Sequence, residues 1–230
     1  MRKLIVFLTV ILCCISLTAC SGTDANDSPG TTSSKSRQAE QARTEQNAKN
    51  ALVVYFSMPE TTKADNMTEE EENSTVVIDG EVLGNTQYVA MVIQKNTGAD
   101  IFRIEPQEPY TTNHEELVAI ASQEQEEKAR PAIKEKITNF EQYDTVFIGY
   151  PIWWSDMPMI MYSFFDEYDF NGKTIIPFST HGGSGLVGTL NTISELEPVA
   201  TIYEQALSIS RDNIAEAEAS IIEWIDILNN

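Results

Sequence analysis

Residues 143–158 read YDTVFIGYPIWWSDMP and combine an apolar run with an aromatic loop. From Tyr143 to Pro151 the apolar residues do not alternate with polar ones, which is typical of a strand buried on both faces of a sheet. Two adjacent tryptophans, Trp153 and Trp154, follow directly. This stretch therefore predicts a central strand of an α/β sheet, with an aromatic loop at its carboxyl end.

Similar apolar runs recur along the chain and alternate with segments that have the signals of helices. Strands are predicted at 51–56, 99–105, 143–151 and 173–180, with a weaker one at 199–207. Helices are predicted at 85–98, 113–130, 158–168, after the glycines of 182–185, and at 212–228. This alternation predicts an α/β fold, a doubly wound five-stranded parallel sheet with helices on both faces.

Residues 58–83 interrupt the alternation, between the first strand and the first helix. Two short apolar stretches flank Asp79 and Gly80, which is a turn signal, so we predict an inserted hairpin. The acidic run 69–72 precedes it. Consecutive carboxylates lack the alternating positions of a calcium loop, so the run predicts a solvated loop rather than a metal site.

The N-terminal residues have the composition of an export signal. Positive residues precede an apolar run that ends in LTAC, which resembles the lipobox of bacterial lipoproteins. We expect a signal peptide at 1–19 and lipid attachment at Cys20, hence an extracytoplasmic, membrane-anchored protein; an ordinary signal peptide or a membrane helix is the alternative. Residues 20–50 nearly lack apolar side chains and predict a flexible tether. Residues 51–230 then form a single domain.

The chain is strongly acidic, with 35 Asp and Glu against 15 Lys and Arg and a formal net charge of −20. Such a charge repels nucleic acid, so we expect no nucleic-acid partner. It could steer a basic protein partner or simply keep the chain soluble. Removal of the signal would leave Cys20 as the only cysteine, which excludes a disulfide, a thiol catalyst and a cysteine metal site.

Ligands of open α/β sheets bind beyond the carboxyl ends of the strands, where the strand order reverses. Three loops leave predicted strands at that edge. The first joins Ser57, across the insertion, to Gly84, Asn85 and Thr86. Its hydroxyl, amide and backbone N–H groups at a helix N-terminus suit a phosphate. A turn glycine followed by a helix cap explains the same residues.

The other two loops suit a planar ring. The second consists of Pro151, Ile152, Trp153 and Trp154. It offers a flat aromatic face, and we expect one tryptophan to contact a ligand while the other packs in the fold; two core aromatics are the alternative. The third consists of Thr180, His181, Gly182 and Gly183. Its glycines allow close approach to backbone N–H groups, unless it is only a flexible turn.

The sequences YFS (55–57), PIWWSDMP (151–158) and STHGGSG (179–185) make the chain from residue 51 resemble the flavodoxin family. Residues 84–106 are similar to the flavodoxin segment from the phosphate loop through the first helix to the second strand. The resemblance implies the strand order 2-1-3-4-5 and FMN as cofactor. It assigns the phosphate of FMN to the first loop, and the two sides of the flavin ring to the second and third loops. The 58–83 insertion, which splits the phosphate loop, departs from the family pattern.

Because FMN carries the redox chemistry itself, the resemblance implies electron transfer to a partner protein or a small-molecule acceptor. The protein would then be an electron carrier or an oxidoreductase, with no catalytic acid–base pair of its own. His181 could contact the ring or donate a proton to it, or it could only bond to the backbone. The alternative function is a flavodoxin-fold lipoprotein that acts as a non-redox binding module.

Overall fold

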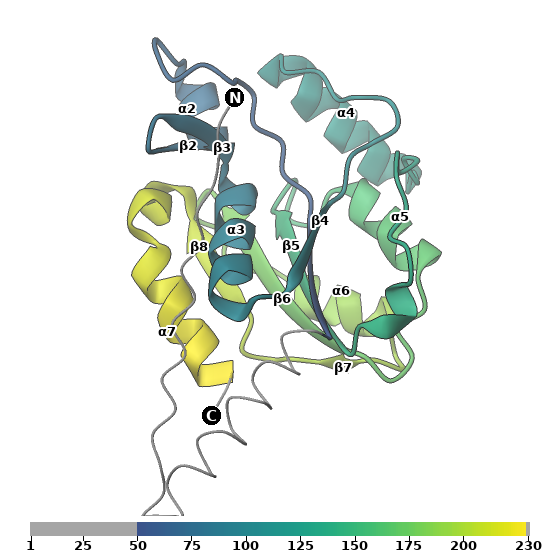
Figure 1. The fold of residues 1–230 in the computed structure, drawn as a ribbon. Coiled ribbons are helices and arrows are strands. Elements are labelled where there is room, and N and C mark those ends of the chain that lie inside the picture. Colours follow the sequence, from purple (N-terminus) through teal and green to yellow (C-terminus); the bar gives the residue numbers. More distant parts are fainter. Residues whose placement is uncertain (1–49, 229–230) are drawn as a thin grey trace, which may run out of the picture. The chain divides into compact units, whose positions relative to one another are not determined.

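The computed structural model describes residues 50–228, and a parallel sheet forms the centre of that region (Figure 1). Its strands are β1 (Ala51–Tyr55), β4 (Asp100–Arg103), β5 (Thr145–Pro151), β6 (Thr174–His181), β7 (Thr201–Ile202) and β8 (Leu207–Ser210). They are ordered β4-β1-β5-β6, and both β7 and β8 pair with β6. The predicted order 2-1-3-4-5 is thus found, except that two short strands share the fifth position.

Helices cover both faces of this sheet. On one side lie α3 (Asn85–Thr97) and α7 (Glu218–Leu228), and on the other α4 (His114–Glu127), α5 (Met159–Glu167) and α6 (Thr189–Leu196) (Figure 1). Two short 3-10 helices, η1 (Phe140–Gln142) and η2 (Arg211–Glu216), complete the described elements. None of the helices within residues 50–228 has the length and apolar character needed to cross a bilayer.

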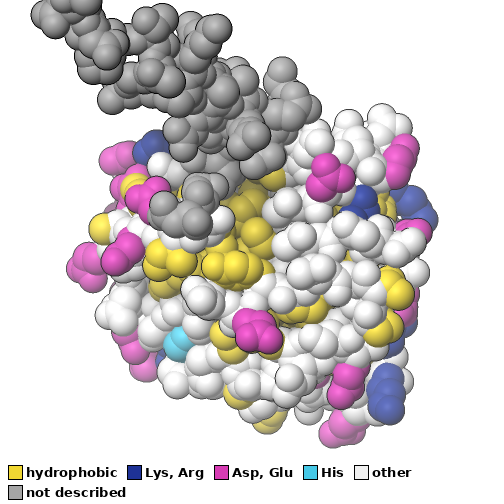
Figure 2. Space-filling model, turned by 90° about the horizontal axis from the view of Figure 1, so that it is seen from below, with side chains coloured by type: hydrophobic (Ala, Val, Ile, Leu, Met, Phe, Trp, Pro, Cys, Tyr) yellow, Lys and Arg dark blue, Asp and Glu magenta, His cyan; other side chains and the backbone are white. Residues whose placement is uncertain are grey.

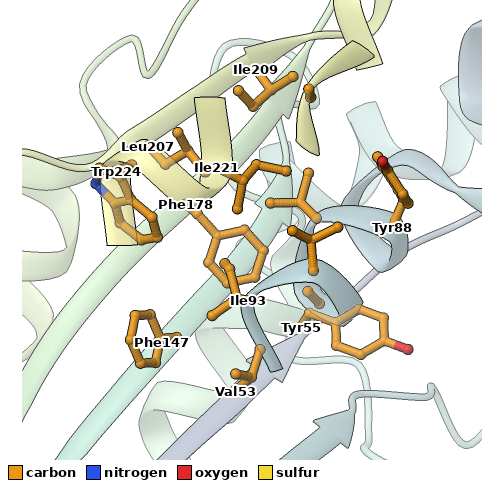
Figure 3. Packing of buried hydrophobic residues seen from close by; sticks show 14 of the residues in the cluster. Val53, Tyr55, Tyr88, Ile93, Phe147, Phe178, Leu207, Ile209, Ile221 and Trp224 are labelled. Atoms are coloured by element: carbon orange, nitrogen blue, oxygen red, sulfur yellow. The ribbon is translucent and has the colours of Figure 1, made fainter. Parts of the chain in front are cut away.

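The strands are apolar throughout because each face of the sheet has its own core. Along β1, Val53 and Tyr55 point into the core with α3 and α7, which contains Phe147 and Phe178 (Figure 3). Leu52 and Val54 point into the core on the opposite face, with α5 and α6. A strand buried on both sides needs no polar alternation, which is why its sequence is a continuous apolar run.

The insertion folds as a short helix followed by a hairpin. Strands β2 (Thr75–Ile78) and β3 (Glu81–Gly84) pair antiparallel, and Asp79 and Gly80 both have positive φ, as the predicted turn requires. The prediction of a loop at 69–72 is wrong, because these residues begin helix α2 (Glu69–Ser74). Thr68 and Glu71 form a reciprocal capping box, and the acidic first turn favours the positive end of the helix dipole.

On the face shown in Figure 2, acidic side chains lie at several separate places rather than in one patch. In residues 50–228, no group of three His, Cys, Asp or Glu side chains is arranged to hold a metal ion. The predicted signal peptide, the tether and Cys20 lie outside the described residues, apart from Asn50 at the end of the tether.

Glu197, just after α6, is expected to destabilise the fold above neutral pH. Burial, followed by the nearby Asp169 and Asp166, raises its pKa from 4.5 to about 7. A raised carboxyl pKa means that folding favours the protonated form, so stability falls as pH rises from about 4.5 to about 7. Glu197→Gln should add about 1 kcal/mol at pH 8, after allowance for solvent screening, and almost nothing at pH 4.

Thermal or urea unfolding of both proteins at pH 4 and pH 8 measures this difference. Glu195→Gln is the control, since it removes an exposed carboxylate two residues earlier, from α6. A gain of equal size at both pH values would contradict the role of Glu197 ionisation.

Candidate ligand-binding site

A cavity of about 370 Å³ lies at the carboxyl edge of the sheet, a size typical of small-molecule pockets. The three loops predicted from sequence meet there. The predicted residues that line it are Ser57, Asn85, Thr86, Pro151, Ile152, Trp153, Trp154, Thr180, His181 and Gly182. Residues from the insertion, from α4 and from the start of η2 complete the wall.

Two predicted residues, Gly84 and Gly183, do not line the cavity but shape the loops that do. A Cβ atom on Gly84 would lie 2.2 Å from Ser57 Oγ, so only glycine lets the end of the insertion return beside β1. Gly183 has φ +112°, which L side chains rarely adopt, and its N–H donates to His181 Nδ1 at 2.9 Å. Both glycines therefore support the site indirectly.

The start of α3 forms the polar end of the cavity. The Thr86 and Thr180 hydroxyl oxygens lie 2.7 Å apart, which joins the helix start to the end of β6. Asn85 donates from Nδ2 to the Asn73 carbonyl at 2.9 Å, while its buried Oδ1 has no hydrogen-bond partner among the described residues. The first backbone N–H groups of a helix lack intrahelical partners. This end thus offers donors for an anion and one acceptor that requires a donor.

The two tryptophans have different environments, although both line the cavity. Trp153 packs edge-on against Phe56 and Tyr110, with ring centroids 5.5 and 5.8 Å away. Trp154 is 55% exposed, and its indole N–H donates to the Val118 carbonyl of α4 at 3.1 Å. Its φ of 48° belongs to the tight turn after β5. Trp153 therefore belongs to an aromatic cluster, and Trp154 stands at the cavity mouth.

His181 is held in its neutral form. Burial lowers its pKa below 6.5, and the nearby Asp212 only partly opposes this effect. Its Nδ1 accepts the hydrogen bond from the Gly183 N–H, which requires that this nitrogen carry no proton. The Gly183 N–H thus holds the His181 imidazole against the backbone of the loop. This agrees with the interpretation from the sequence in which His181 only bonds to the backbone.

Sequence reasoning missed several residues of the wall. His114 Nδ1 lies 3.0 Å from both carboxylate oxygens of Glu60, whose side chain is only 8% exposed, and both residues line the cavity. Leu117 and Ala121 add an apolar stripe from α4, and Arg211 adds a cation. The spacing of Leu117 and Ala121 predicts a buried helix face, but nothing local indicates that this face borders a ligand site.

The wall has the chemistry that a phosphorylated planar ring requires. Hydroxyl, amide and free helix N–H groups gather at the start of α3, where a phosphate is favoured. The unpartnered Asn85 Oδ1 would accept from a hydroxyl of a sugar-like chain. Ile152, Trp153 and Leu117 give apolar and aromatic surface for a ring. The residues present therefore fit such a ligand.

Comparison with known proteins identifies the family. The family model described as Flavodoxin matches residues 74–228. A protein from Bacteroides eggerthii, provisionally assigned as a flavoprotein, is 28% identical with a TM-score of 0.58, over 77% of this chain and 96% of that one. A similarly assigned protein from Bacteroides uniformis is 23% identical with a TM-score of 0.59, over 78% and 99%.

A flavoprotein from Lactobacillus acidophilus, solved in complex with FMN, is 15% identical with a TM-score of 0.51, over 75% of this chain and 99% of that chain. At this low identity the similarity shows the fold alone. A search of curated proteins gave no match. The family model covers most of the chain and includes every strand of the parallel sheet except β1, together with most of the residues that line the cavity. The chain belongs to the flavodoxin family.

Proposed function

We propose that this protein binds FMN in the cavity and transfers electrons to and from other molecules. The observation that carries the proposal is the convergence of three separate loops on one cavity, whose wall combines hydroxyl and amide groups with aromatic surface. Family membership and the relative solved with FMN support this choice of cofactor. When bound, FMN supplies the redox chemistry.

The protein's own part is to bind and orient the cofactor. Ser57, Asn85 and Thr86 would hold the phosphate at the start of α3, where the helix dipole favours negative charge. Trp153 is fixed by Phe56 and Tyr110, so it presents a rigid wall to the ring. The neutral His181 adds no charge beside the ring. This arrangement serves electron transfer, for which the chain itself needs no catalytic acid–base pair.

The exposed Trp154 suggests where electrons enter and leave. Its indole stands at the cavity mouth and is more than half exposed. A partner protein or a small-molecule acceptor could approach the ring along this side. We include in the proposal the extracytoplasmic, membrane-anchored location expected from the lipobox-like sequence at Cys20, which mass spectrometry of the membrane fraction would test by detecting a lipid-modified cysteine.

Cofactor binding and reduction test the proposed function. The purified protein is titrated with FMN under anaerobic conditions, reduced with dithionite, and then mixed with ferricyanide as a one-electron acceptor. We expect quenching of flavin fluorescence, saturation at one FMN per chain, and reoxidation that returns the flavin absorbance. If the protein took up no flavin, the redox function would be excluded and the non-redox binding module would remain.

A further inference from the structure

We infer that Arg211 is a cationic phosphate-binding residue that makes this site select phosphorylated flavin; the inference rests on the proposed FMN binding and deepens it. Arg211 begins η2, directly after strand β8, and lines the cavity. The register pairs Ser210 with His181, so Arg211 continues next to Gly182 of the third loop. No local sequence signal links it to the phosphate loop.

Charge makes such a residue necessary. Among the described residues of the cavity wall, Arg211 is the only lysine or arginine, whereas Glu60 and Glu70 both line it. The whole chain carries a formal net charge of −20. A phosphate monoester carries a charge of about −1.5 to −2 at pH 7. Without a nearby cation, a dianion would enter a site that already holds two carboxylates, and repulsion would weaken its binding.

The insertion explains why helix α3 needs this assistance. A continuous phosphate loop would supply consecutive backbone N–H groups between β1 and α3. Here residues 58–83 separate Ser57 from the start of α3, and their return places Asn73 and Ser74 in the wall instead. The Asn73 carbonyl is already engaged by Asn85, and Ser74 Oγ accepts from the Glu60 N–H. A guanidinium with several N–H donors can replace the lost backbone donors.

The geometry leaves the guanidinium available. A Cβ on Gly182 would lie 3.1 Å from Arg211 Cζ, so the absence of a side chain there gives the guanidinium its place against the loop. Within the described part of the chain, its one ion-pair partner is Asp212, at 4.0 Å between Nε and Oδ1. That distance is too long for a hydrogen bond, and the Arg211 side chain is 40% exposed. Its donors are therefore free to bind an anion.

The Thr86–Thr180 contact links this cation to the helix start. Thr180 lies two residues before Gly182 and touches Thr86 at the start of α3. Helix η2, which Arg211 begins, also packs against α2 and β2 of the insertion, and the hairpin of the insertion leads directly into α3. The buried Oδ1 of Asn85, the first residue of α3, has no partner among the described residues and independently indicates that a ligand completes this end. We therefore assign Arg211 to the phosphate rather than to the ring.

The experiment compares FMN with riboflavin, which lacks the phosphate. Arg211→Gln should weaken FMN binding by about 30-fold and leave riboflavin binding within about twofold, because a charge-assisted hydrogen bond is lost only with FMN. Arg211→Lys should fall between, since lysine keeps the charge but not the planar fork. Arg130→Gln is the matched control. It removes the same charge from a side chain of nearly equal exposure, 39%, that does not line the cavity.

Two further measurements make the outcome decisive. Raising the salt concentration should weaken FMN binding by wild type more than by Arg211→Gln. Inorganic phosphate should raise the melting temperature of wild type and Arg130→Gln but not of Arg211→Gln. This phosphate result is expected even if wild type binds neither FMN nor riboflavin. The absence of flavin binding would overturn only the proposed function. Equal losses for FMN and riboflavin, or unchanged phosphate stabilisation in Arg211→Gln, would overturn the assignment.

Discussion

Valine in place of Thr86 is expected to weaken FMN binding by about 30-fold. Thr86 is 1% exposed and lines the cavity, and its hydroxyl oxygen lies 2.7 Å from that of Thr180, which also lines it. Valine has nearly the same shape but cannot donate a hydrogen bond to a phosphate. A hydrogen bond to a charged group contributes about 1.5–3 kcal/mol, equivalent to about 10- to 150-fold in affinity. Titration followed by flavin fluorescence measures the change.

Thr86→Ser is the control, since serine keeps the hydroxyl and should bind FMN within about threefold of wild type. Riboflavin binding should change little in either variant, because the hydroxyl serves the phosphate. The free energy of unfolding should fall by about 1 kcal/mol in Thr86→Val alone, since the Thr180 hydroxyl loses its partner. A loss of riboflavin affinity as large as that of FMN would show that Thr86 acts on the ring or only on the fold.

The strands of the sheet could be predicted because their signal is local. Parallel strands covered on both faces must be apolar at every position, and Val53 and Ile148, both fully buried, meet this condition irrespective of the neighbouring strand. The fifth position is less regular. There Thr201–Ile202 and Leu207–Ser210 pair separately with β6, and residues 203–206 between them belong to neither strand, although the Tyr203 N–H still donates to the Ile175 carbonyl of β6. The local sequence does not indicate where a strand is interrupted in this way.

The acidic run 69–72 follows a helix-start signal that the prediction of a loop does not take into account. Thr68 and Glu71 have the spacing of a capping box, which predicts a helix start. The loop is predicted only because consecutive carboxylates lack the alternating positions of a calcium loop, which is no argument against a helix. In the structure the glutamates lie in the first turn, where the helix dipole offsets their charge. Like charges at a helix start are thus less unfavourable than the same run elsewhere.

The cavity could be predicted where topology alone places residues, and not elsewhere. Any residue directly after a parallel strand reaches the same edge, so Ser57, Trp153 and His181 follow from the strand order. The contact between Glu60 and His114 depends instead on how the insertion folds back over α4, across 54 residues of sequence. Arg211 depends on the register of β8 against β6. These long-range relations have no local sequence signal.

Alanine at Gly149 is expected to destabilise the fold by about 3 kcal/mol, the largest effect on stability that we predict. Gly149 lies in β5 opposite Phe178 of β6, and a Cβ there would be 2.1 Å from Phe178 Cζ. Phe178 is fully buried in the core with α3 and α7, so its ring has no open space to enter (Figure 3). Overpacking of a tight core costs about 1–3 kcal/mol or more. Urea unfolding measures the change.

Phe178→Leu provides the compensating variant, because leucine does not reach the position of the distal ring atoms that would clash. Alone it should cost about 1–2 kcal/mol through lost burial and the remaining cavity. The double variant should be more stable than the sum of the two single losses predicts, by at least 1 kcal/mol, since each change removes the other's penalty. Additive losses would mean that Gly149 is required for backbone freedom instead. Its strand conformation, without positive φ, argues against that explanation.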